Sequence, residues 1–480
     1  MEKQRTSKEI TPRSEDFSQW YLDMVLKAEL ADYGPVKGCM IIRPYGYAVW
    51  ELMQGDMDRR IKETGHVNAY FPLFIPKSFL EKEKDHVEGF SPECAWVTIG
   101  GGEELDEPLA IRPTSESMIC TMYAKWVKSW RDLPILINQW CNIVRWEKVT
   151  RPFLRTTEFL WQEGHTLHVS EAEAEEETLR MLGVYKDFSE QMLAMPVLHG
   201  RKTDAEKFAG ALRTYAIEAL MQDGRALQAG TSHNLGQHFA TAYGIEFLDK
   251  DQERRKPWST SWGTSTRMVG GLIMSHGDDL GLVLPPKVAP YQVVIVPIPP
   301  RQGSSREQVL PKAREVQAAL RGAGIRVHLD DRETQQPGFK YADWEMRGVP
   351  LRLELGPKDI EKQQCVLVRR DTREKAFVPL SGLAAAVSER LEALQGALLE
   401  AARKRVESMT TRVGSYDEFK QVMSAKRGFI VAGWNGDPAV EARIKEETKA
   451  TVRIIPFEER EAACVMTGQK GREVYFAQAY

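Results

Sequence analysis

Charged side chains alternate with apolar residues through the segment 142–165, NIVRWEKVTRPFLRTTEFLWQEGH. The alternation predicts a β-hairpin whose tip lies near Thr150, Arg151 and Pro152. Its charged residues would then face one side of a sheet: Arg145, Glu147, Arg155, Glu158 and Glu163. A face of fixed charges needs a charged ligand, and arginine grips carboxylates and phosphates through two parallel hydrogen bonds. The alternative is an edge hairpin whose charged face is only solvated.

The spacing of these residues resembles motif 2 of the class II aminoacyl-tRNA synthetases, and the string RTTEFLWQEGH resembles the prolyl-tRNA synthetases in particular. The resemblance implies that Arg145 bridges the substrate carboxylate and the α-phosphate of ATP. It also implies that Arg155 holds the outer phosphates, that Glu147 binds the adenine amino group, and that Phe159 lies against the adenine ring.

The reaction implied by this resemblance is attack of an amino-acid carboxylate on the α-phosphorus of ATP. Because the carboxylate is already ionised at neutral pH, no general base is required. The reaction needs two anions held in line and extra negative charge neutralised at the phosphate. We therefore expect the catalytic residues to be Arg145, Arg155 and Arg267, the last of which resembles the arginine of motif 3.

Thr114 and Glu116 begin a predicted helix, where a cap threonine and a first-turn carboxylate have a purely structural explanation. They also match the TxE pair with which prolyl-tRNA synthetases hold the ammonium group of proline, whose two donors need acceptors. The same resemblance places further residues at proline: Trp161, Glu163, His165 and Ser261. His165 could equally be a core histidine without a ligand.

The string ALQAGTSHNLG predicts a strand that runs into a glycine-rich turn. Gln228, Thr231 and His233 match the QxGTSH signature of the prolyl-tRNA synthetases, and small residues there let the backbone approach a nucleotide. We expect Gln228 and Thr231 at ATP, together with Ser265 and with Arg267 at the start of a helix. Mg²⁺ is expected as the companion of ATP.

The expected fold class is mixed α/β, in three domains. By resemblance, residues 1–288 form a catalytic domain on an antiparallel sheet, 289–405 an α/β anticodon-binding domain, and 406–480 a small α/β domain. Strands and helices alternate after residue 290, which predicts a mostly parallel, buried sheet in the second domain. A helix over 383–408 then leads to the third.

Two elements are expected near the N-terminus. Helical spacing after Ser14 predicts an amphipathic helix with a serine cap. The string HVNAYFPLFIP at 66–76 predicts a buried strand that ends in proline. Pro72 resembles motif 1, which builds the dimer interface of class II enzymes, so a homodimer is expected.

A run of charged residues occupies 344–359, WEMRGVPLRLELGPKD. Resemblance to the anticodon-binding domain implies that its charges read exposed bases of tRNA and hold phosphates. The residues concerned are Glu345, Arg347, Arg352, Lys358 and Asp359. Alternating charges on an exposed edge are commonly just solvated, so that interpretation stays open.

From Tyr416 the chain resembles the C-terminal domain of the archaeal and eukaryotic type of prolyl-tRNA synthetase, which often holds zinc through two cysteine pairs. Here Asn435, Val440 and Thr467 occupy three matching positions and only Cys464 remains. One thiolate cannot hold a tetrahedral zinc, so we expect no zinc and a core packed around Val440 instead. In this type the terminal carboxylate, here on residue 480, lies near the active site, although terminal residues commonly fray.

Composition limits the class of protein. The 480 residues are too many for one core, and no apolar run approaches the roughly 20 residues of a membrane span. Six scattered cysteines give no disulfide framework, which indicates a reducing, cytoplasmic location. The net charge of −3 requires any RNA contact to come from local basic patches.

These features together predict an enzyme that joins proline to its tRNA with ATP. Two alternatives are an RNA-binding paralogue without activity and an enzyme that loads an amino acid onto a carrier protein. Only about 60 residues separate His165 from Gln228, too few for the large editing insertion of the bacterial type. We therefore expect some misactivation of alanine and cysteine, which are smaller than proline.

Overall fold

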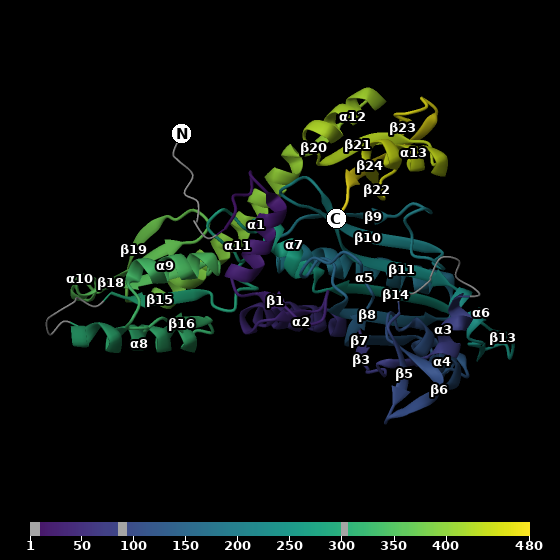
Figure 1. Cartoon of the computed structure of the whole chain (residues 1–480), viewed down its shortest axis with the longest axis horizontal. Coiled ribbons are helices and arrows are strands. Elements are labelled where there is room, and N and C mark those ends of the chain that lie inside the picture. Colours follow the sequence, from purple (N-terminus) through teal and green to yellow (C-terminus); the bar gives the residue numbers. More distant parts are fainter. Residues whose placement is uncertain (1–9, 85–93, 299–305) are drawn as a thin grey trace.

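The computed structural model describes residues 10–84, 94–298 and 306–480. Its hydrophobic clusters lie in three consecutive parts of the chain, named the first region (10–288), the second region (289–405) and the third region (406–480). The two largest clusters of the first region lie on the two sides of its main sheet, a further cluster fills the second region, and another fills the third. Figure 1 shows these regions as purple to teal, green, and yellow segments.

A seven-stranded sheet organises the first region. Its strands, in spatial order, are β3 (Val67–Asn68), β7 (Ile135–Val144), β8 (Glu158–His168), β14 (Trp258–Ser265), β11 (Ala226–Gly236), β10 (Arg213–Leu220) and β9 (Val197–Arg201). Every neighbouring pair is antiparallel except β3 and β7. The antiparallel platform expected from the sequence is therefore confirmed.

Helices cover this sheet on the side away from the pocket described below. The helix α5 (Glu171–Gln191) begins at the Ser170 cap and buries its apolar stripe against the sheet. It is joined there by α7 (Arg267–His276), α1 (Phe17–Lys27) and α2 (Pro44–Glu63). The cap of α1 is Asp16, whose carboxylate accepts two backbone N–H bonds, so the predicted serine cap is wrong.

The predicted buried strand over 66–76 is also wrong. The segment contains β3 in the main sheet and β4 (Phe74–Pro76) in a separate three-stranded sheet, and Val67 and Phe74 are 62% and 47% exposed. The backbone between them is held by side chains: Phe71 donates its N–H to Gln139 at 2.7 Å, and its carbonyl accepts from Arg112 at 2.8 Å. The second sheet adds β5 (Trp96–Gly100) and β6 (Glu103–Ile111), flanked by α3 (Lys77–Lys84) and α4 (Glu116–Trp126).

The predicted hairpin is present, but its charges do not share one face. The strand β7 ends at Val144 and β8 begins at Glu158, so Arg145, Glu147 and Arg155 belong to the connecting loop. Tyr21 donates its hydroxyl to the Pro152 carbonyl at 2.7 Å, and Thr157 donates its N–H to the Gly38 carbonyl at 2.8 Å. These bonds fold the loop against the first helix and the segment after it. On β8, Glu158 is exposed and Glu163 is buried.

Small elements complete the first region. They are the hairpin of β1 (Ala31–Tyr33) and β2 (Met40–Ile42), the helix α6 (His238–Ala242), and the pair β12 (Phe247–Leu248) and β13 (Arg254–Arg255). The helix α6 packs near α3 and α4.

The sheet of the second region is mixed, which corrects the mostly parallel prediction. Its strands, in order, are β16 (Val327–Leu329), β15 (Val293–Pro297), β17 (Leu351–Leu355), β18 (Gln364–Arg369) and β19 (Lys375–Pro379). The pairs of β15 with β16 and β17 are parallel, whereas β17, β18 and β19 are antiparallel. The last two connections are too short for parallel crossovers. The helices here are α8 (Arg306–Gly322), α9 (Pro337–Met346) and α10 (Pro357–Glu361).

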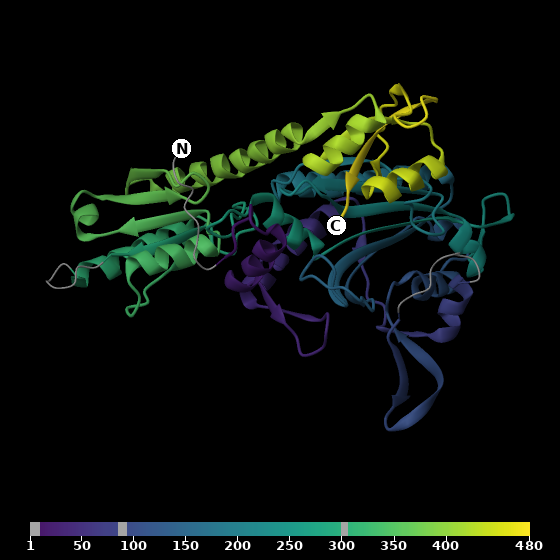
Figure 2. The same cartoon turned by 45° about the horizontal axis from the view of Figure 1, so that its top comes forward.

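A long helix, α11 (Leu383–Ser408), connects the second and third regions and runs between them in Figure 2. It has the bounds predicted from the sequence.

The third region contains a sheet and two helices. In spatial order, the strands of the sheet are β20 (Thr410–Arg412), β21 (Phe429–Trp434), β24 (Lys470–Gln478) and β22 (Ala450–Ile454), and β23 (Glu461–Ala463) pairs with β24. The helices are α12 (Tyr416–Ala425) and α13 (Pro438–Thr448). Val440 is buried in the core of this region, as expected.

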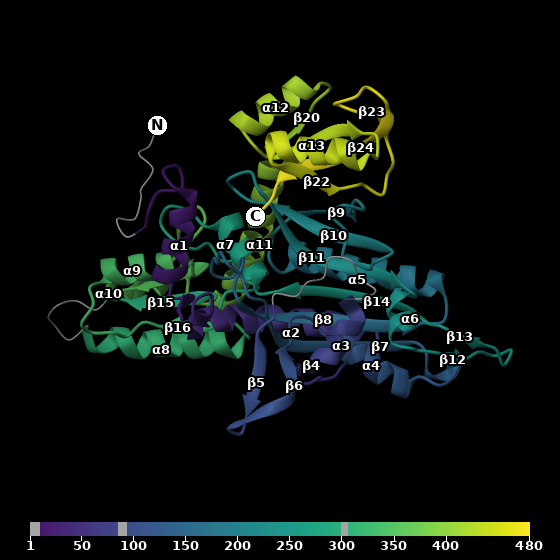
Figure 3. The same ribbon diagram turned by 45° about the vertical axis from the view of Figure 1, so that its right-hand side comes forward.

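The third region lies over β9 and β10 of the first, as Figures 1 and 3 both show. Arg201 and Ile455 pair as an antiparallel bridge there. Among the described residues, no helix is both long and apolar enough to cross a membrane.

Candidate active site

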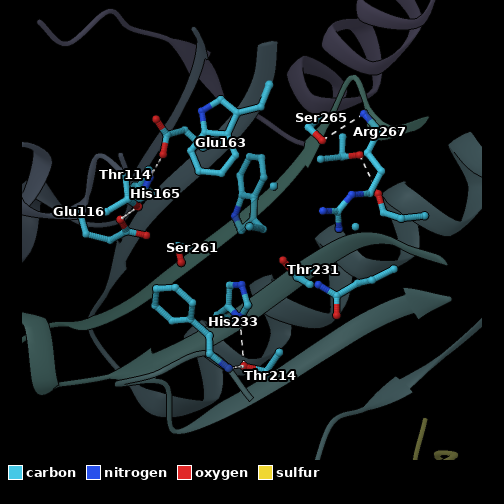
Figure 4. Close-up of a pocket in the computed structure, with 18 of the residues that line it drawn as sticks. Thr114, Glu116, Glu163, His165, Thr214, Thr231, His233, Ser261, Ser265 and Arg267 are labelled. Carbon is cyan, nitrogen blue, oxygen red and sulfur yellow. Dashed lines mark hydrogen bonds and ion pairs between the residues drawn. The ribbon is translucent and has the colours of Figure 1, made fainter. Parts of the chain in front are cut away.

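A pocket of about 280 Å³ opens on the face of the main sheet opposite α5. Its walls come from β8, β11 and β14, from the start of α4, and from the segment between β9 and β10. Figure 4 shows carboxylates at one end and Arg267 at the other, with Ser261 and His233 between them.

Two carboxylates define the acidic end. Glu116 accepts a short hydrogen bond from the hydroxyl of Thr114, and the N-cap of α4 is Ser115, so the threonine-cap interpretation is wrong. Glu163, on β8, accepts hydrogen bonds from the hydroxyl of Ser115 and, at 2.8 Å, from the amide of Gln139. Both carboxylates are at least 95% buried. Buried carboxylates need hydrogen-bond donors or cations as partners, so this end of the pocket suits a cationic group.

His165 forms an ion pair with Glu163, with 3.0 Å between Nε2 and Oε2. Burial acts to raise the pKa of Glu163, but the hydrogen bond and charge of His165 outweigh it and hold that pKa below its usual value. Burial conversely acts to lower the pKa of His165, and Glu163 outweighs it, so the pKa of the imidazole is raised. The geometry therefore supports a charged pair, which is compatible both with a ligand-binding His165 and with the core histidine that the sequence left open.

Arg145 lies beside this acidic end. Its Nε donates to the Pro113 carbonyl at 3.0 Å, which ties the guanidinium to the residue before Thr114. The guanidinium carbon lies 5.5 Å from the ring centre of Trp161 and 5.8 Å from that of Phe159. Burial lowers the pKa of Arg145, and the charges of nearby carboxylates oppose that shift. An arginine keeps its proton in such surroundings, so the pocket holds a fixed cation near two fixed anions.

Arg267 occupies the other end, at the first residue of α7. Its Nε donates to the Leu154 carbonyl of the hairpin loop at 3.0 Å, and its N–H donates to Ser265 at 3.2 Å. Burial lowers the pKa of Arg267, and the positive charges of Arg155 and Arg145 lower it further. A cation that other cations destabilise in this way is stabilised by an anion, which makes this end suited to phosphates.

The centre of the pocket is set by strand register. Ser261 on β14 lies opposite His165 on one side and opposite His233 on the other. His233 forms a hydrogen bond with Thr214 at 3.0 Å and packs against Phe208, with ring centres 4.8 Å apart. Burial lowers the pKa of His233 to about 3, and the charge of His165 adds to that shift, so His233 is neutral.

Most of the predicted site residues line this one pocket. They are Thr114, Glu116, Arg145, Phe159, Trp161, Glu163, His165, Gln228, Thr231, Ser261, Ser265 and Arg267. Arg155 and Glu147 are not in its wall: Arg155 is exposed on the hairpin loop, and both act on the site through their charges. Sequence reasoning missed several contributors, among them Ser115, Gln139, Glu206, Lys207, Phe208 and Thr214. No sequence motif distinguishes these residues, because the tertiary structure alone brings them to the pocket.

The residues expected at tRNA lie far from this pocket, in the second region. Glu345 pairs with Arg352 at 3.0 Å, and Arg347 pairs with Asp343 at 3.2 Å. Asp359 accepts a backbone N–H at 2.9 Å at the start of its own helix, next to Lys358.

The end of the chain lies beside the strand that carries Gln228. Tyr480 donates its N–H to the Ala226 carbonyl at 3.1 Å, and its ring lies 5.5 Å from the Arg225 guanidinium carbon. Tyr480 is not among the residues that line the pocket.

The pocket can hold a zwitterion and a polyanion end to end. The two carboxylates suit an ammonium group, Arg145 suits a carboxylate or phosphate between the ends, and Arg267 suits further phosphates. Of the described residues, no three His, Cys, Asp or Glu side chains come together as metal ligands.

Sequence models of three families match the chain in consecutive segments. The tRNA synthetase class II core domain (G, H, P, S and T) matches residues 96–276, the anticodon binding domain matches 292–390, and the prolyl-tRNA synthetase C-terminal domain matches 416–480. The first match contains every residue that lines the pocket.

Similar proteins extend over nearly the whole chain. The proline–tRNA ligase of Natranaerobius thermophilus is 60% identical over 477 residues, and that of Rubrobacter xylanophilus is 57% identical over 471. Proline–tRNA ligase 2 of Clostridioides difficile is 55% identical over 475 residues, and each alignment covers 98% of both chains. Similarity this high over full length shows that the chain belongs to the proline–tRNA ligase family of class II aminoacyl-tRNA synthetases.

Proposed function

We propose that this pocket activates L-proline with ATP to prolyl-adenylate and that the chain transfers the prolyl group to the 3′ end of its tRNA. One observation carries the proposal: Arg145 lines a single cavity with paired carboxylates at one end and Arg267 at the other, and its charge interacts with both ends. That order of charges complements the ammonium and carboxylate of proline followed by the phosphates of ATP.

At the acidic end, Thr114, Glu116 and Glu163 accept the two N–H donors of the proline ammonium. The indole of Trp161 and the imidazole of His165 bound the ring, with Ser261 beneath it. The hydrogen bonds from Ser115 and Gln139 support this assignment because they hold Glu163 in a fixed direction.

At the basic end, Arg267, Gln228, Thr231 and Ser265 bind ATP, with Phe159 against the adenine. Arg155 contacts the outer phosphates from the hairpin loop, and Glu147 contacts the adenine amino group, although neither lines the pocket in this structure. Mg²⁺ enters as part of the Mg·ATP substrate, since it binds mainly to phosphate oxygens with few protein ligands.

Catalysis follows from placement and charge. The proline carboxylate attacks the α-phosphorus, pyrophosphate leaves, and Arg145 neutralises the charge that develops on the phosphate. No protein base takes part, because the nucleophile carries no proton at neutral pH.

The remaining assignments concern tRNA and assembly. The catalytic domain spans 1–288, the anticodon-binding domain 289–405 and the C-terminal domain 406–480. The anticodon-binding domain reads the anticodon through Glu345, Arg347, Lys358 and Asp359. The chain acts as a cytoplasmic homodimer through the surface around Pro72, which is supported by the exposure of Val67, Tyr70 and Phe74.

The C-terminal domain is of the archaeal and eukaryotic type and functions without zinc. The backbone N–H of Asn435 and both the hydroxyl and the backbone N–H of Thr467 lie within hydrogen-bonding reach of the Cys464 thiol, so three of the four matching positions meet in space. An amide, a hydroxyl and one thiol are a poor donor set for zinc, which prefers thiolates and imidazoles. The amide of Asn435 instead donates to Gln469 at 2.8 Å.

The proposed function is tested by two assays on the full chain. Proline should support exchange of pyrophosphate into ATP, and tRNA transcripts with the proline anticodon should be charged in preference to transcripts with altered anticodons. An inactive RNA-binding paralogue would show neither activity, and an enzyme that loads a carrier protein would exchange pyrophosphate without charging any transcript.

A further inference from the structure

The irregular segment 202–212, between β9 and β10, forms one wall of the pocket. Glu206, Lys207 and Phe208 line the cavity, and the Phe208 ring packs on His233 in its centre. The N–H of Phe208 also donates to Thr214 at 3.0 Å. The position of this segment therefore sets the shape of the pocket next to Ser261 and the acidic end.

Residues of the third region hold this segment at three points. Thr203 donates its hydroxyl to Glu441 of α13 at 3.0 Å. Lys202 donates to the Arg453 carbonyl of β22 at 3.1 Å. Glu206 lies 3.4 Å from Lys445, and its other oxygen lies 3.6 Å from Arg453.

The same side chains converge on one buried carboxylate of the main sheet. Glu218, on β10, is paired with Lys202 at 3.0 Å and with Arg453 at 2.7 Å. All three residues and Glu441 are at least 95% buried. Buried charges are held in register by their partners, since leaving one unpaired is costly.

Backbone contacts fix the start of the segment. Arg201 and Ile455 exchange two N–H···O bonds of 3.0 and 2.8 Å. A Cβ added at Gly200 would lie 2.4 Å from the Ile455 carbonyl oxygen, so the close approach of the two chains requires glycine. The third region thus extends the catalytic sheet next to the pocket wall.

We propose that Glu441 is a positioning residue for proline binding, because its contact with Thr203 holds the pocket wall 202–212 in place although Glu441 does not line the pocket. The proposal rests on the proposed function. Without this contact the segment gains conformational freedom, and part of the proline binding energy must be used to order it again. The KM for proline should change more than the KM for ATP, because among the described residues Arg267 and Ser265 at the ATP end form no hydrogen bond or ion pair with 202–212, Glu441 or Arg453.

Pyrophosphate exchange by the full chain tests the proposal when proline and ATP are varied separately. Thr203→Val and Glu441→Ala should each raise the KM for proline about 5- to 20-fold and leave the KM for ATP within about twofold, as expected for loss of a buried hydrogen bond to a charged group. The double variant should resemble the singles, since both substitutions remove the same contact. Thr203→Ser keeps the hydroxyl and should retain the wild-type KM.

Arg443→Ala is the matched control, because Arg443 lies on the same helix as Glu441, is exposed, and among the described residues forms an ion pair only with Glu447, at 2.8 Å. Its KM for proline should be unchanged. Hydrogen exchange provides a second measurement: amides of 202–212 should exchange faster in Thr203→Val than in the wild type and slow again with saturating proline, while amides of α5 are unaffected.

An unchanged KM for proline in Thr203→Val and Glu441→Ala would overturn the proposal, as would equal increases in both KM values. If Glu441→Ala does not fold, Thr203→Val alone decides, since it removes one hydroxyl with little change in shape. A wild-type chain that fails to exchange pyrophosphate with proline would instead refute the proposed function.

Discussion

Arg370 holds both carboxylate oxygens of Asp278, at 2.8 and 2.7 Å, and thereby joins the second region to the segment that follows α7. Its Nε also donates to the Glu345 carbonyl at 3.0 Å. Burial acts to raise the pKa of Asp278, but the bond with Arg370 outweighs it and keeps the pKa low. A rigid ion pair therefore connects a residue proposed to read the anticodon with the helix that begins at Arg267.

Arg370→Lys removes the bidentate hydrogen bonding to Asp278 but keeps the positive charge. We expect the kcat/KM for tRNA charging to fall about tenfold, because the second region loses its fixed direction relative to the pocket. Pyrophosphate exchange should stay within about twofold, because it requires only the pocket. The control is Arg369→Lys, which should leave charging intact, since within the described part of the chain Arg369 forms an ion pair only with Asp371 of its own turn, at 2.8 Å. Equal losses in exchange and charging would show that the pair only stabilises the fold of α7.

Arg145→Ala tests the central cation. Removing a preorganised charge from a phosphoryl-transfer site typically lowers kcat about 10²- to 10³-fold, so exchange should be nearly abolished. The melting temperature should change little, because in the described part of the chain the Arg145 side chain donates a single hydrogen bond to the backbone, at the Pro113 carbonyl. Exchange at the wild-type rate would contradict the proposed role.

The pair of Glu163 and His165 predicts a dependence of stability on pH. The pKa of His165 is raised in the folded chain, so its contribution is fully present below the unfolded value of about 6.5 and is lost as the pH rises through the folded pKa. The pKa of Glu163 is lowered, so its contribution is present above about 4.3 and is lost only as the pH falls through the folded pKa.

His165→Gln removes the titrating charge and can still donate a hydrogen bond. We expect the wild type to melt at a higher temperature than the variant at pH 5.5 to 6.5, and the difference to shrink toward pH 9. Thermal unfolding of both proteins across this range measures the effect. A difference that is constant with pH would mean that His165 is neutral throughout.

The spacing of apolar residues and the turn residues in the sequence predicted helices whose ends are set by nearby residues. The α11 bounds, Leu383 and Ser408, follow from an uninterrupted helical spacing, and Arg267 opens its helix as expected after a tight turn. The resemblance to a family supplied most pocket residues. The charged face of the hairpin was mispredicted because 13 residues that look like strand form a loop whose path is set by contacts with Tyr21 and Gly38.

What the sequence could not show is long-range support. Ser115 and Gln139 hold Glu163 from 48 and 24 residues away, and neither stands in a recognisable motif. Glu441 and Arg453 reach the wall of the pocket from more than 230 residues away. Such partners are specified by packing and strand register, which a single sequence does not reveal.

Metal analysis tests the C-terminal domain. We expect less than about 0.1 equivalent of zinc in the purified chain, since Cys464 is the one thiol at the matching positions. Treatment with a chelator should leave the melting temperature unchanged, because the core around Val440 and Phe476 is packed by apolar side chains. One equivalent of tightly bound zinc would overturn this expectation.

Selectivity against smaller amino acids should be limited. Under the proposed function, Glu116, Glu163 and Arg145 bind the ammonium and carboxylate groups, which every amino acid has. Discrimination then depends on the ring, where each missing methylene changes binding by about 1 to 3 kcal/mol. Alanine and cysteine fit inside a pocket shaped for proline, because no residue can exclude a smaller side chain. We expect pyrophosphate exchange with both, at kcat/KM values reduced by about 10²- to 10⁴-fold relative to proline. Alanine attached to tRNA should remain attached when incubated with this chain, and rapid hydrolysis would reveal an editing activity that the proposed function lacks.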